Sequence, residues 1–307
     1  MFENGKIALG LMMLCALLLP ACGKEPATDV KPLRERLCAL ADTVHGTVGI
    51  AFVSDNDTVT INNGVKYPMM SVFKLHQAIA VADAMERMGG SFDSVMSIRN
   101  AELDRNTWSP MLKHVGNADF DISVGELVKY ALVSSDNNAS NLLFEKIISP
   151  QETDVFVKSV AEDTTFQILY SEAEMMRNHA LSYYNHTSPL SAGLLIKQVF
   201  GSDVICDGSR DAIKCDLSVV TTGQDRLAAV FTNGDNDVFF AHKTGRGYRN
   251  DAGELVAHND VGYFRFPDGR DYSLAVFIRD FTGSEDEASK VIADISRCVY
   301  EYFTSRQ

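Results

Sequence analysis

The sequence predicts a mixed α/β fold, an α+β sandwich in which one antiparallel sheet is built from both ends of the chain and flanked by helices. Strand-like runs rich in β-branched and aromatic residues occur near the two ends, at 47–53, 58–61, 237–243, 254–266 and 272–279. Between them, from about residue 71 to residue 200, apolar residues recur at helical spacing. These patterns predict a sheet domain of residues 32–65 and 219–307 and an all-helical domain of residues 66–218.

The first 21 residues have the composition of an export signal. The apolar run from Ile7 to Leu19 follows Lys6 and is too short for a bilayer span, which needs about 20 residues. Leu19-Pro-Ala-Cys22 resembles a lipobox, in which the cysteine becomes the lipidated N-terminus. We therefore predict an exported, periplasmic protein with a lipid anchor at Cys22 and a linker over residues 22–31. A plain secretory signal cleaved nearby is the alternative.

Charge and apolar content limit the partners of this chain. The 307 residues carry a formal net charge of −13, and no basic block or aromatic-basic alternation occurs. This argues against nucleic acid as a partner. Because no second long apolar run exists, the N-terminal anchor is the only membrane contact that we expect, and we expect a monomer that binds a small molecule.

The six cysteines and seven histidines do not form a metal-binding pattern. No C-x-x-C, H-E-x-x-H or H-x-H spacing occurs, so we expect neither a metal nor a cofactor. Cys206 and Cys215 are nine residues apart in a polar stretch. An oxidising compartment would permit a disulfide between them, and two buried free thiols are the alternative.

The N-terminal part of the mature chain begins with a helix and a hairpin. Leu33, Leu37, Leu40 and Val44 recur at helical spacing and predict the helix. The two strand-like runs that follow are separated by Ser54-Asp-Asn-Asp57, a sequence that favours a turn, so we predict a β-hairpin.

Helices are predicted for the middle of the chain. Pro68 disfavours helix at Tyr67, and apolar residues at Val72, Ile79 and Met85 predict a helix after Ser71 that is buried on most sides. Three further helices are predicted at 124–133, 139–148 and 190–200.

The C-terminal third returns to strands and ends in a helix. Pro267-Asp-Gly269 predicts a turn between the last two strand-like runs. Apolar residues then recur at helical spacing from residue 285 to residue 303. We therefore expect the last strands to join the N-terminal hairpin in one sheet, beside a final helix.

A serine and a lysine stand at the start of the buried helix. Lys74 follows Ser71 by three residues, so the two side chains share one helix face. A lysine there can accept the hydroxyl proton if burial lowers the pKa of its amine. A capping serine followed by a snorkelling lysine is the ordinary interpretation of this spacing.

Three further polar clusters change that interpretation. Ser135-Asp-Asn137 lies between two predicted helices, Glu172 lies in a segment without clear periodicity, and Lys243-Thr-Gly245 ends a strand-like run at a sheet edge. Each is ordinary alone, as a helix cap, a surface acid and a solvated lysine. Their occurrence in this order after S-x-x-K indicates a catalytic site.

This order resembles that of the class A serine β-lactamases. The resemblance extends from about Leu33 to Phe303 and includes Tyr67-Pro-Met-Met-Ser71, Asn137-Asn-Ala-Ser-Asn141, Thr221-Thr-Gly-Gln-Asp-Arg226 and His242-Lys-Thr-Gly245. It implies a serine β-lactamase/penicillin-binding-protein-like fold with the active site at the domain interface. It also implies a hydrolase of β-lactams from the cephalosporinase-like branch. No G-x-S-x-G elbow of an ordinary α/β-hydrolase is present.

The resemblance implies five catalytic residues. Ser71 would attack the lactam carbonyl and form an acyl-enzyme. Lys74 would move its proton, alone or with Glu172 through a water, and Glu172 would activate the hydrolytic water. Ser135 would protonate the departing nitrogen, and Lys243 would polarise that network and attract the substrate carboxylate.

The resemblance also implies substrate contacts. Trp108 would stand at the cleft rim, with simple core packing as the alternative, and Asn137 would bind the side-chain amide of the substrate. Arg226 would hold its carboxylate bidentately, beside the K-T-G residues Thr244 and Gly245. The backbone N–H groups of Ser71 and Arg246 would form the oxyanion hole.

Several residues depart from the family pattern around Glu172. Ala173 stands where the family commonly has proline, and a cis bond there would cost about 3–4 kcal/mol, so the loop is expected to follow another path. Met176 replaces an asparagine that helps to hold the hydrolytic water, and Tyr170 replaces an arginine that pins the loop. Arg246 replaces a small residue after K-T-G, where it would narrow the cleft or add a cation.

Two alternative functions share parts of this pattern. A penicillin-binding D,D-peptidase or transpeptidase shares the serine, the lysine and K-T-G, and a non-hydrolysing β-lactam sensor would acylate and stop. Both lack a base for hydrolysis of the acyl-enzyme, so Glu172 favours the β-lactamase.

Overall fold

The computed structural model describes residues 29–201, 205, 207–233 and 237–306. The predicted signal peptide, the lipidation candidate Cys22, most of the linker and Cys206 lie outside the described residues. Cys215 has an exposed free thiol. The alternative of two buried thiols is therefore wrong for Cys215.

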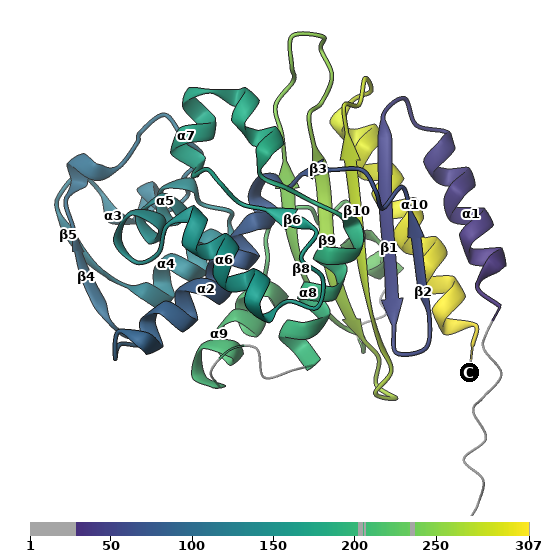
Figure 1. Ribbon diagram of the computed structural model, residues 1–307, viewed down its shortest axis with the longest axis horizontal. Coiled ribbons are helices and arrows are strands. Elements are labelled where there is room, and N and C mark those ends of the chain that lie inside the picture. Colours follow the sequence, from purple (N-terminus) through teal and green to yellow (C-terminus); the bar gives the residue numbers. More distant parts are fainter. Residues whose placement is uncertain (1–28, 202–204, 206, 234–236, 307) are drawn as a thin grey trace, which may run out of the picture.

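A five-stranded antiparallel sheet joins the two ends of the chain, as predicted (Figure 1). Its order is β2-β1-β10-β9-β8, with the N-terminal hairpin paired to the C-terminal strand β10. The strands are β1 (Thr47–Ser54), β2 (Thr58–Ile61), β8 (Phe239–Arg246), β9 (His258–Arg265) and β10 (Asp271–Arg279). β9 begins four residues later than the predicted run, because residues 254–257 make only isolated bridges, at Leu255.

The described residues form ten helices. They are α1 (Lys31–Asp42), α2 (Phe73–Arg87), α3 (Leu112–Val115), α4 (Val124–Val133), α5 (Asn137–Lys146), α6 (Pro150–Val160), α7 (Glu172–Arg177), α8 (Pro189–Gly201), α9 (Asp207–Ser218) and α10 (Glu285–Thr304). Short 3₁₀ segments are η1 (Met70–Val72), η2 (Asn100–Glu102), η3 (His179–Tyr184) and η4 (Leu227–Asn233).

The outer face of the sheet is covered by α1 and α10, which lie side by side in Figure 1. A capping box of Ser284 and Glu287 starts α10, because each residue satisfies the backbone N–H of the other. The apolar stripe predicted for residues 285–303 is buried against α1 and the strands. Local capping and periodicity therefore account for the position and bounds of this helix.

The inner face of the sheet is covered by α8. The other helices of residues 66–218, called the helical part below, pack next to α8 and the sheet. One apolar core contains both sheet residues, such as Ala275 and Phe277, and residues of α2, α4 and α5. The sheet and the helical part therefore share a core across the interface where the site was predicted. The boundaries at residues 66 and 218 stay a prediction.

The helical part also contains two small sheets that periodicity did not reveal. One pairs β4 (Val95–Ile98) with β5 (Phe120–Ser123), and the other joins β3 (Tyr67–Pro68), β7 (His186–Thr187) and β6 (Phe166–Gln167). Strands of two to four residues are too short to give a recognisable alternation. The second sheet brackets the segment that carries Glu172.

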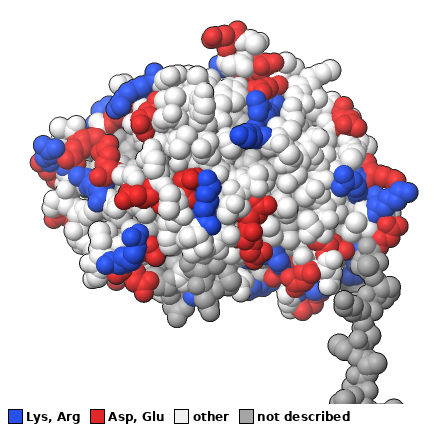
Figure 2. All heavy atoms as spheres, in the orientation of Figure 1, with Lys and Arg blue, Asp and Glu red and all other residues white. Residues whose placement is uncertain are grey.

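Charges of both signs are interspersed on the face in Figure 2, and no basic patch extends across it. Among the described residues, no helix has the length and apolar character needed to span a membrane.

Candidate active site

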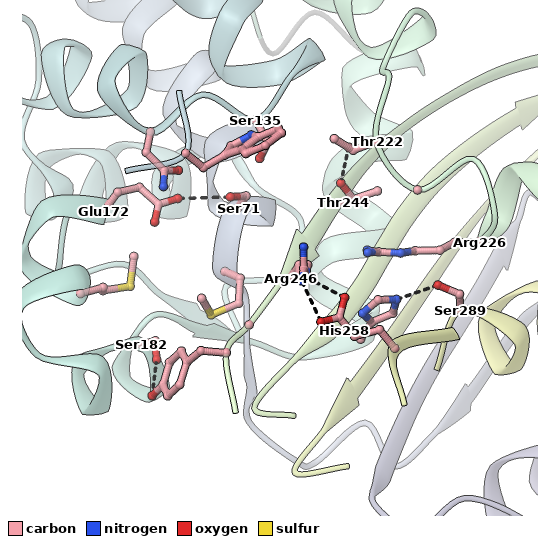
Figure 3. Close-up of a pocket in the computed structure, with 18 of the residues that line it drawn as sticks. Ser71, Ser135, Glu172, Ser182, Thr222, Arg226, Thr244, Arg246, His258 and Ser289 are labelled. Carbon is pink, nitrogen blue, oxygen red and sulfur yellow. Dashed lines mark hydrogen bonds and ion pairs between the residues drawn. The ribbon is translucent and has the colours of Figure 1, made fainter. Parts of the chain in front are cut away.

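A cleft of about 560 Å³ lies between the helical part and β8, the edge strand of the large sheet. Figure 3 shows Ser71, Ser135 and Glu172 on one side of it and Thr244, Arg246 and Arg226 on the other. The predicted site residues that line it are Ser71, Trp108, Ser135, Asn137, Glu172, Arg226, Thr244 and Arg246. Lys74, Lys243 and Gly245 are buried and do not line it.

Ser71 lies in η1, immediately before the buried helix α2. The preceding Met70 has φ of 46°, in the left-handed region that non-glycine residues rarely adopt. The side-chain amide of Asn259 on β9 donates to the carbonyls of Pro68 (2.8 Å) and Met69 (3.2 Å). These bonds from the sheet hold the strained turn that presents the hydroxyl of Ser71 to the cleft.

Gly245 lies where β8 packs closely on the segment before Ser71. A Cβ at this position would lie 2.4 Å from the carbonyl oxygen of Met69. The absence of a side chain therefore lets β8 approach the segment before Ser71. Gly245 is buried and does not line the cleft, so its role as a substrate contact stays a prediction.

Lys74, Ser71 and Glu172 form a triangle of hydrogen bonds. Nζ of Lys74 lies 3.0 Å from Oγ of Ser71 and 2.9 Å from Oε1 of Glu172, and Ser71 donates to the same Oε1 at 3.2 Å. Lys74 also donates to the carbonyl of Ser135 (2.9 Å) and to Oδ1 of Asn137 (2.7 Å). The lysine is fully buried but paired, which replaces the interpretation of a snorkelling side chain. Both groups named as acceptors of the Ser71 proton are within reach.

Ser135 lies in the loop between α4 and α5, as predicted, with φ of 57°. Asp136 holds this loop, because its carboxylate caps α5 at the N–H of Ala139 and accepts from Met111 N–H and the hydroxyl of Ser109. The hydroxyl of Ser135 accepts a hydrogen bond from Lys243 at 3.1 Å.

Lys243 is fully buried on β8 and has no contact with solvent. Burial lowers the pKa of its amine well below the usual value, and the charge of nearby Lys74 lowers it further. An amine with a lowered pKa gives up a proton more readily to Ser135. The edge position was predicted correctly, but the interpretation of a solvated lysine is wrong.

Glu172 is the first residue of α7, a short helix that the irregular sequence did not indicate. Ser171 caps this helix in a capping box with Glu174, and Ala173 N–H donates to Oδ1 of Asn141. All peptide bonds of the described residues are trans. The capping contacts at the start of α7 therefore set the position of Glu172.

Asn185 fixes the two ends of the segment between β6 and β7. Its Oδ1 accepts from the N–H groups of Leu169 (2.8 Å) and Tyr170 (3.0 Å), and its Nδ2 donates to the carbonyl of Tyr170 (2.7 Å). The amide of Asn185 is fully buried, and its three bonds hold the loop at Tyr170, where the family has an arginine. Sequence reasoning missed Asn185, and no local pattern marks it.

The sheet side of the cleft carries hydroxyl groups and two arginines. Thr222 and Thr244 share a hydrogen bond of 2.6 Å, and Arg226 is 7% exposed with Nη1 donating to the carbonyls of Gly245 (3.3 Å) and Asn259 (2.8 Å). Burial lowers the pKa of the Arg226 guanidinium, which still stays charged. These bonds fix the guanidinium at the end of the cleft.

Arg246 is not a free cation at the cleft. Its guanidinium forms two bonds with the carboxylate of Glu285 at the start of α10, at 2.7 and 2.8 Å (Figure 3). The arginine side chain is 64% exposed. Its charge is therefore shared with an acid that sequence reasoning did not consider.

Trp108 and Asn137 complete the helical side. Trp108 is 62% exposed, donates to the carbonyl of Ser134 at 2.9 Å and lines the cleft, so its ring is not part of the core. Asn137 accepts from Lys74 through Oδ1 and donates through Nδ2 to the hydroxyl of Thr107 at 3.0 Å.

This arrangement supports acyl transfer. A serine nucleophile contacts a carboxylate and an amine that can take its proton, and a second serine is bonded to a lysine that can supply one. An electrophilic carbonyl placed beside Ser71 would have a proton acceptor on one side and a proton donor on the other.

Known proteins show the same sequence pattern and fold. A model of the beta-lactamase enzyme family matches residues 32–303. A β-lactamase from Phocaeicola vulgatus is 42% identical over 276 residues, 90% of this chain and 85% of that protein. The crystal structure of a class A β-lactamase from Bacteroides cellulosilyticus has a TM-score of 0.82 at 29% identity, covering 89% of this chain and 97% of that one. The TLA-3 extended-spectrum β-lactamase has a TM-score of 0.84 at 28% identity, covering 89% and 98%.

The family match spans both the sheet strands and the helical part, and the shared fold extends over nearly the whole length of both solved relatives. The motifs that suggested the family meet at one cleft. Ser71, Ser135 and Thr244 line it, and the buried Lys74 and Lys243 are hydrogen-bonded to the two serines. The chain belongs to the beta-lactamase enzyme family and is a class A serine β-lactamase, a hydrolase that opens β-lactams.

Proposed function

We propose that this β-lactamase forms an acyl-enzyme on Ser71, hydrolyses it with a water activated by Glu172, and prefers cephalosporins. The observation that carries the mechanism is the triangle of Lys74, Ser71 and Glu172, with distances of 2.9–3.2 Å. A chromogenic cephalosporin followed through many turnovers tests the hydrolysis directly. A single stoichiometric burst without turnover would instead indicate a sensor or a transpeptidase.

In acylation, Oγ of Ser71 bonds to the lactam carbonyl carbon as its proton passes to Glu172 or Lys74. The backbone N–H groups of Ser71 and Arg246 stabilise the oxyanion, a contribution of about 2.7–4 kcal/mol per donor. The lactam C–N bond then breaks, and the nitrogen receives a proton from Ser135. Lys243, at 3.1 Å, replaces that proton, and the proton taken from Ser71 is passed on to restore Lys243, so Glu172 is again a carboxylate when the acyl-enzyme is complete.

In deacylation, the carboxylate of Glu172 takes a proton from a water molecule. The water oxygen attacks the ester carbonyl, the bond to Oγ of Ser71 breaks, and Oγ receives the proton that Glu172 took from the water, which restores the carboxylate. A base of this kind distinguishes hydrolysis from the two alternative functions. The carboxylate at 3.2 Å from Oγ of Ser71 therefore favours the hydrolase.

The preference for cephalosporins rests on both ends of the cleft. Met175 and Met176 line it where the family has a more rigid floor, so a wide side chain can be accommodated. The carboxylate of a cephalosporin lies further from the lactam than that of a penicillin, and Arg226, which lines the cleft, provides the cation at that end. The pairing of Arg246 with Glu285 leaves Arg226 as the main carboxylate ligand.

We expect Arg226→Ala to lower kcat/KM for cephalosporins by the equivalent of about 2–5 kcal/mol, because the substrate buries this ion pair. Arg226→Lys keeps the charge but loses the planar fork, so its loss should be smaller. Steady-state kinetics should also give wild-type protein a higher kcat/KM for cephalosporins than for benzylpenicillin.

Controls separate binding from folding in this test. Nη1 of Arg226 also bonds two backbone carbonyls, so the melting temperature of each variant must be measured. A cephalosporin methyl ester, which lacks the charge, should lose little in Arg226→Ala. An equal loss for acid and ester, or a clear preference for benzylpenicillin, would contradict the assignment.

We also propose export to the periplasm with a lipid anchor at Cys22 and action as a monomer. Globomycin should make the precursor accumulate, and Cys22→Ser should release soluble protein, because the diacylglyceryl thioether supplies the membrane contact. Cell fractionation measures both effects. Unchanged fractions in both experiments would favour the plain signal peptide.

A further inference from the structure

The segment that carries Glu172 contacts the sheet through an aromatic clasp across the end of the cleft. Tyr248 lies two residues beyond β8, and its ring packs on His179 with centroids 4.2 Å apart and planes at 31°. Its hydroxyl donates to the carbonyl of His179 at 2.6 Å. Ser182, which is 1% exposed, donates to the same carbonyl at 2.6 Å.

The three residues of this clasp, Tyr248, His179 and Ser182, all line the cleft. In Figure 3, Ser182 lies at the end of the cleft away from Ser135, on the same side as Glu172. Tyr248 comes from the sheet side, two residues after Arg246, and His179 follows α7 by two residues. The clasp therefore links the strand with the proposed oxyanion N–H to the helix with the proposed base.

The other contacts of the segment show which part of it depends on Tyr248. Asn185 fixes the two ends of the segment, and Asn141 fixes the start of α7. The distal half, η3, is attached to the sheet by Tyr248 and by Tyr183, whose hydroxyl donates to Asp280 at 2.6 Å. Without the Tyr248 contact, the far end of α7 would be held to the sheet only through Tyr183, six residues beyond the last residue of α7.

We propose that Tyr248 is a positioning residue for deacylation. Its ring and hydroxyl hold α7 through His179, so that Glu172 stays in range of the ester formed on Ser71. This inference rests on the proposed role of Glu172 as the base. A displacement of about 1 Å at a reacting group can cost up to about a hundredfold in rate. Acylation is less sensitive, because Lys74 also contacts Ser71.

The test uses Tyr248→Ala, which removes the ring and hydroxyl, and Tyr248→Phe, which removes only the hydroxyl. Tyr184→Phe is the matched control, because Tyr184 is on the same η3 segment, is 54% exposed and does not line the cleft. The full-length enzyme is assayed with a chromogenic cephalosporin. The readouts are kcat, KM, melting temperature and the acylated fraction in acid-quenched mass spectra.

We expect Tyr248→Ala to lower kcat by about tenfold to a hundredfold and to lower KM in parallel, with most of the enzyme acylated at steady state. Tyr248→Phe should show a smaller change in the same direction, and Tyr184→Phe should match the wild type.

A folded Tyr248→Ala protein with wild-type kcat and acylated fraction would overturn the proposal. So would a fall in kcat/KM without accumulation of acyl-enzyme, because the residue would then act before deacylation. If Tyr248→Ala does not fold, Tyr248→Phe decides by the same criteria. Glu172→Gln, measured in parallel, separates a wrong role of Tyr248 from a wrong role of Glu172. If Glu172→Gln does not accumulate acyl-enzyme, the role of Glu172 is wrong, whatever the Tyr248 variants show.

Discussion

Ser71→Ala is expected to abolish covalent labelling by penicillin and to lower kcat by roughly 10⁴- to 10⁶-fold. The alanine removes the oxygen that forms the ester, and among the described residues no other hydroxyl is bonded to both Lys74 and Glu172. Intact-protein mass spectrometry after incubation with benzylpenicillin measures the label. Steady-state hydrolysis measures the rate.

The matched control for this change is Ser159→Ala. Ser159 is an exposed serine of α6 that does not line the cleft, so its loss should leave both labelling and hydrolysis at wild-type values. Persistent labelling of Ser71→Ala would mean that another residue is the nucleophile. The melting temperature should change little, since Ser71 is only partly buried.

Glu172→Gln should leave acylation measurable but stall hydrolysis, with kcat lower by about 10²- to 10⁴-fold. Glutamine keeps the shape of the side chain but cannot accept a proton from water at neutral pH. The acyl-enzyme should therefore accumulate and persist in mass spectra for longer than one wild-type turnover. The acylated fraction should therefore rise in Glu172→Gln, whereas it should fall to zero in Ser71→Ala.

Glu174→Gln provides the matched control on the same helix. Glu174 caps α7 by accepting from the N–H and hydroxyl of Ser171, and glutamine can make the same contacts. This variant loses the same charge but should turn over normally. Rapid turnover by Glu172→Gln would refute the assignment of Glu172 as the base, and stalled turnover by both variants would point to a general effect of charge or loop stability.

The amino-acid sequence determined those features whose physical cause is local. Helical spacing and the capping residues Ser284 and Glu287 determine where α10 begins and which face it buries. The turn residues between β1 and β2 determine the hairpin. The interval of three between Ser71 and Lys74 places both side chains on one face, with 3.0 Å between Nζ and Oγ. The order of the motifs indicated the family, which the comparisons confirm.

Only the tertiary structure decided how distant residues meet. Glu172 is 101 residues from Ser71, and Lys243 is 108 residues from Ser135, yet each pair is within 3.2 Å. These distances depend on the core shared by the sheet and the helical part, which no short window of sequence encodes.

The same reason explains the features that sequence reasoning missed. Gly245 is needed because β8 packs on Met69, Arg246 is paired because α10 begins beside it, and Asn185 holds a loop whose other end is fifteen residues away. Burial of Lys243 by the completed fold, rather than its neighbours in the chain, lowers its pKa. Spacing within one element sets which side chains can share a face. Packing between elements sets which charges are buried, which cations are neutralised and which carboxylate reaches the nucleophile.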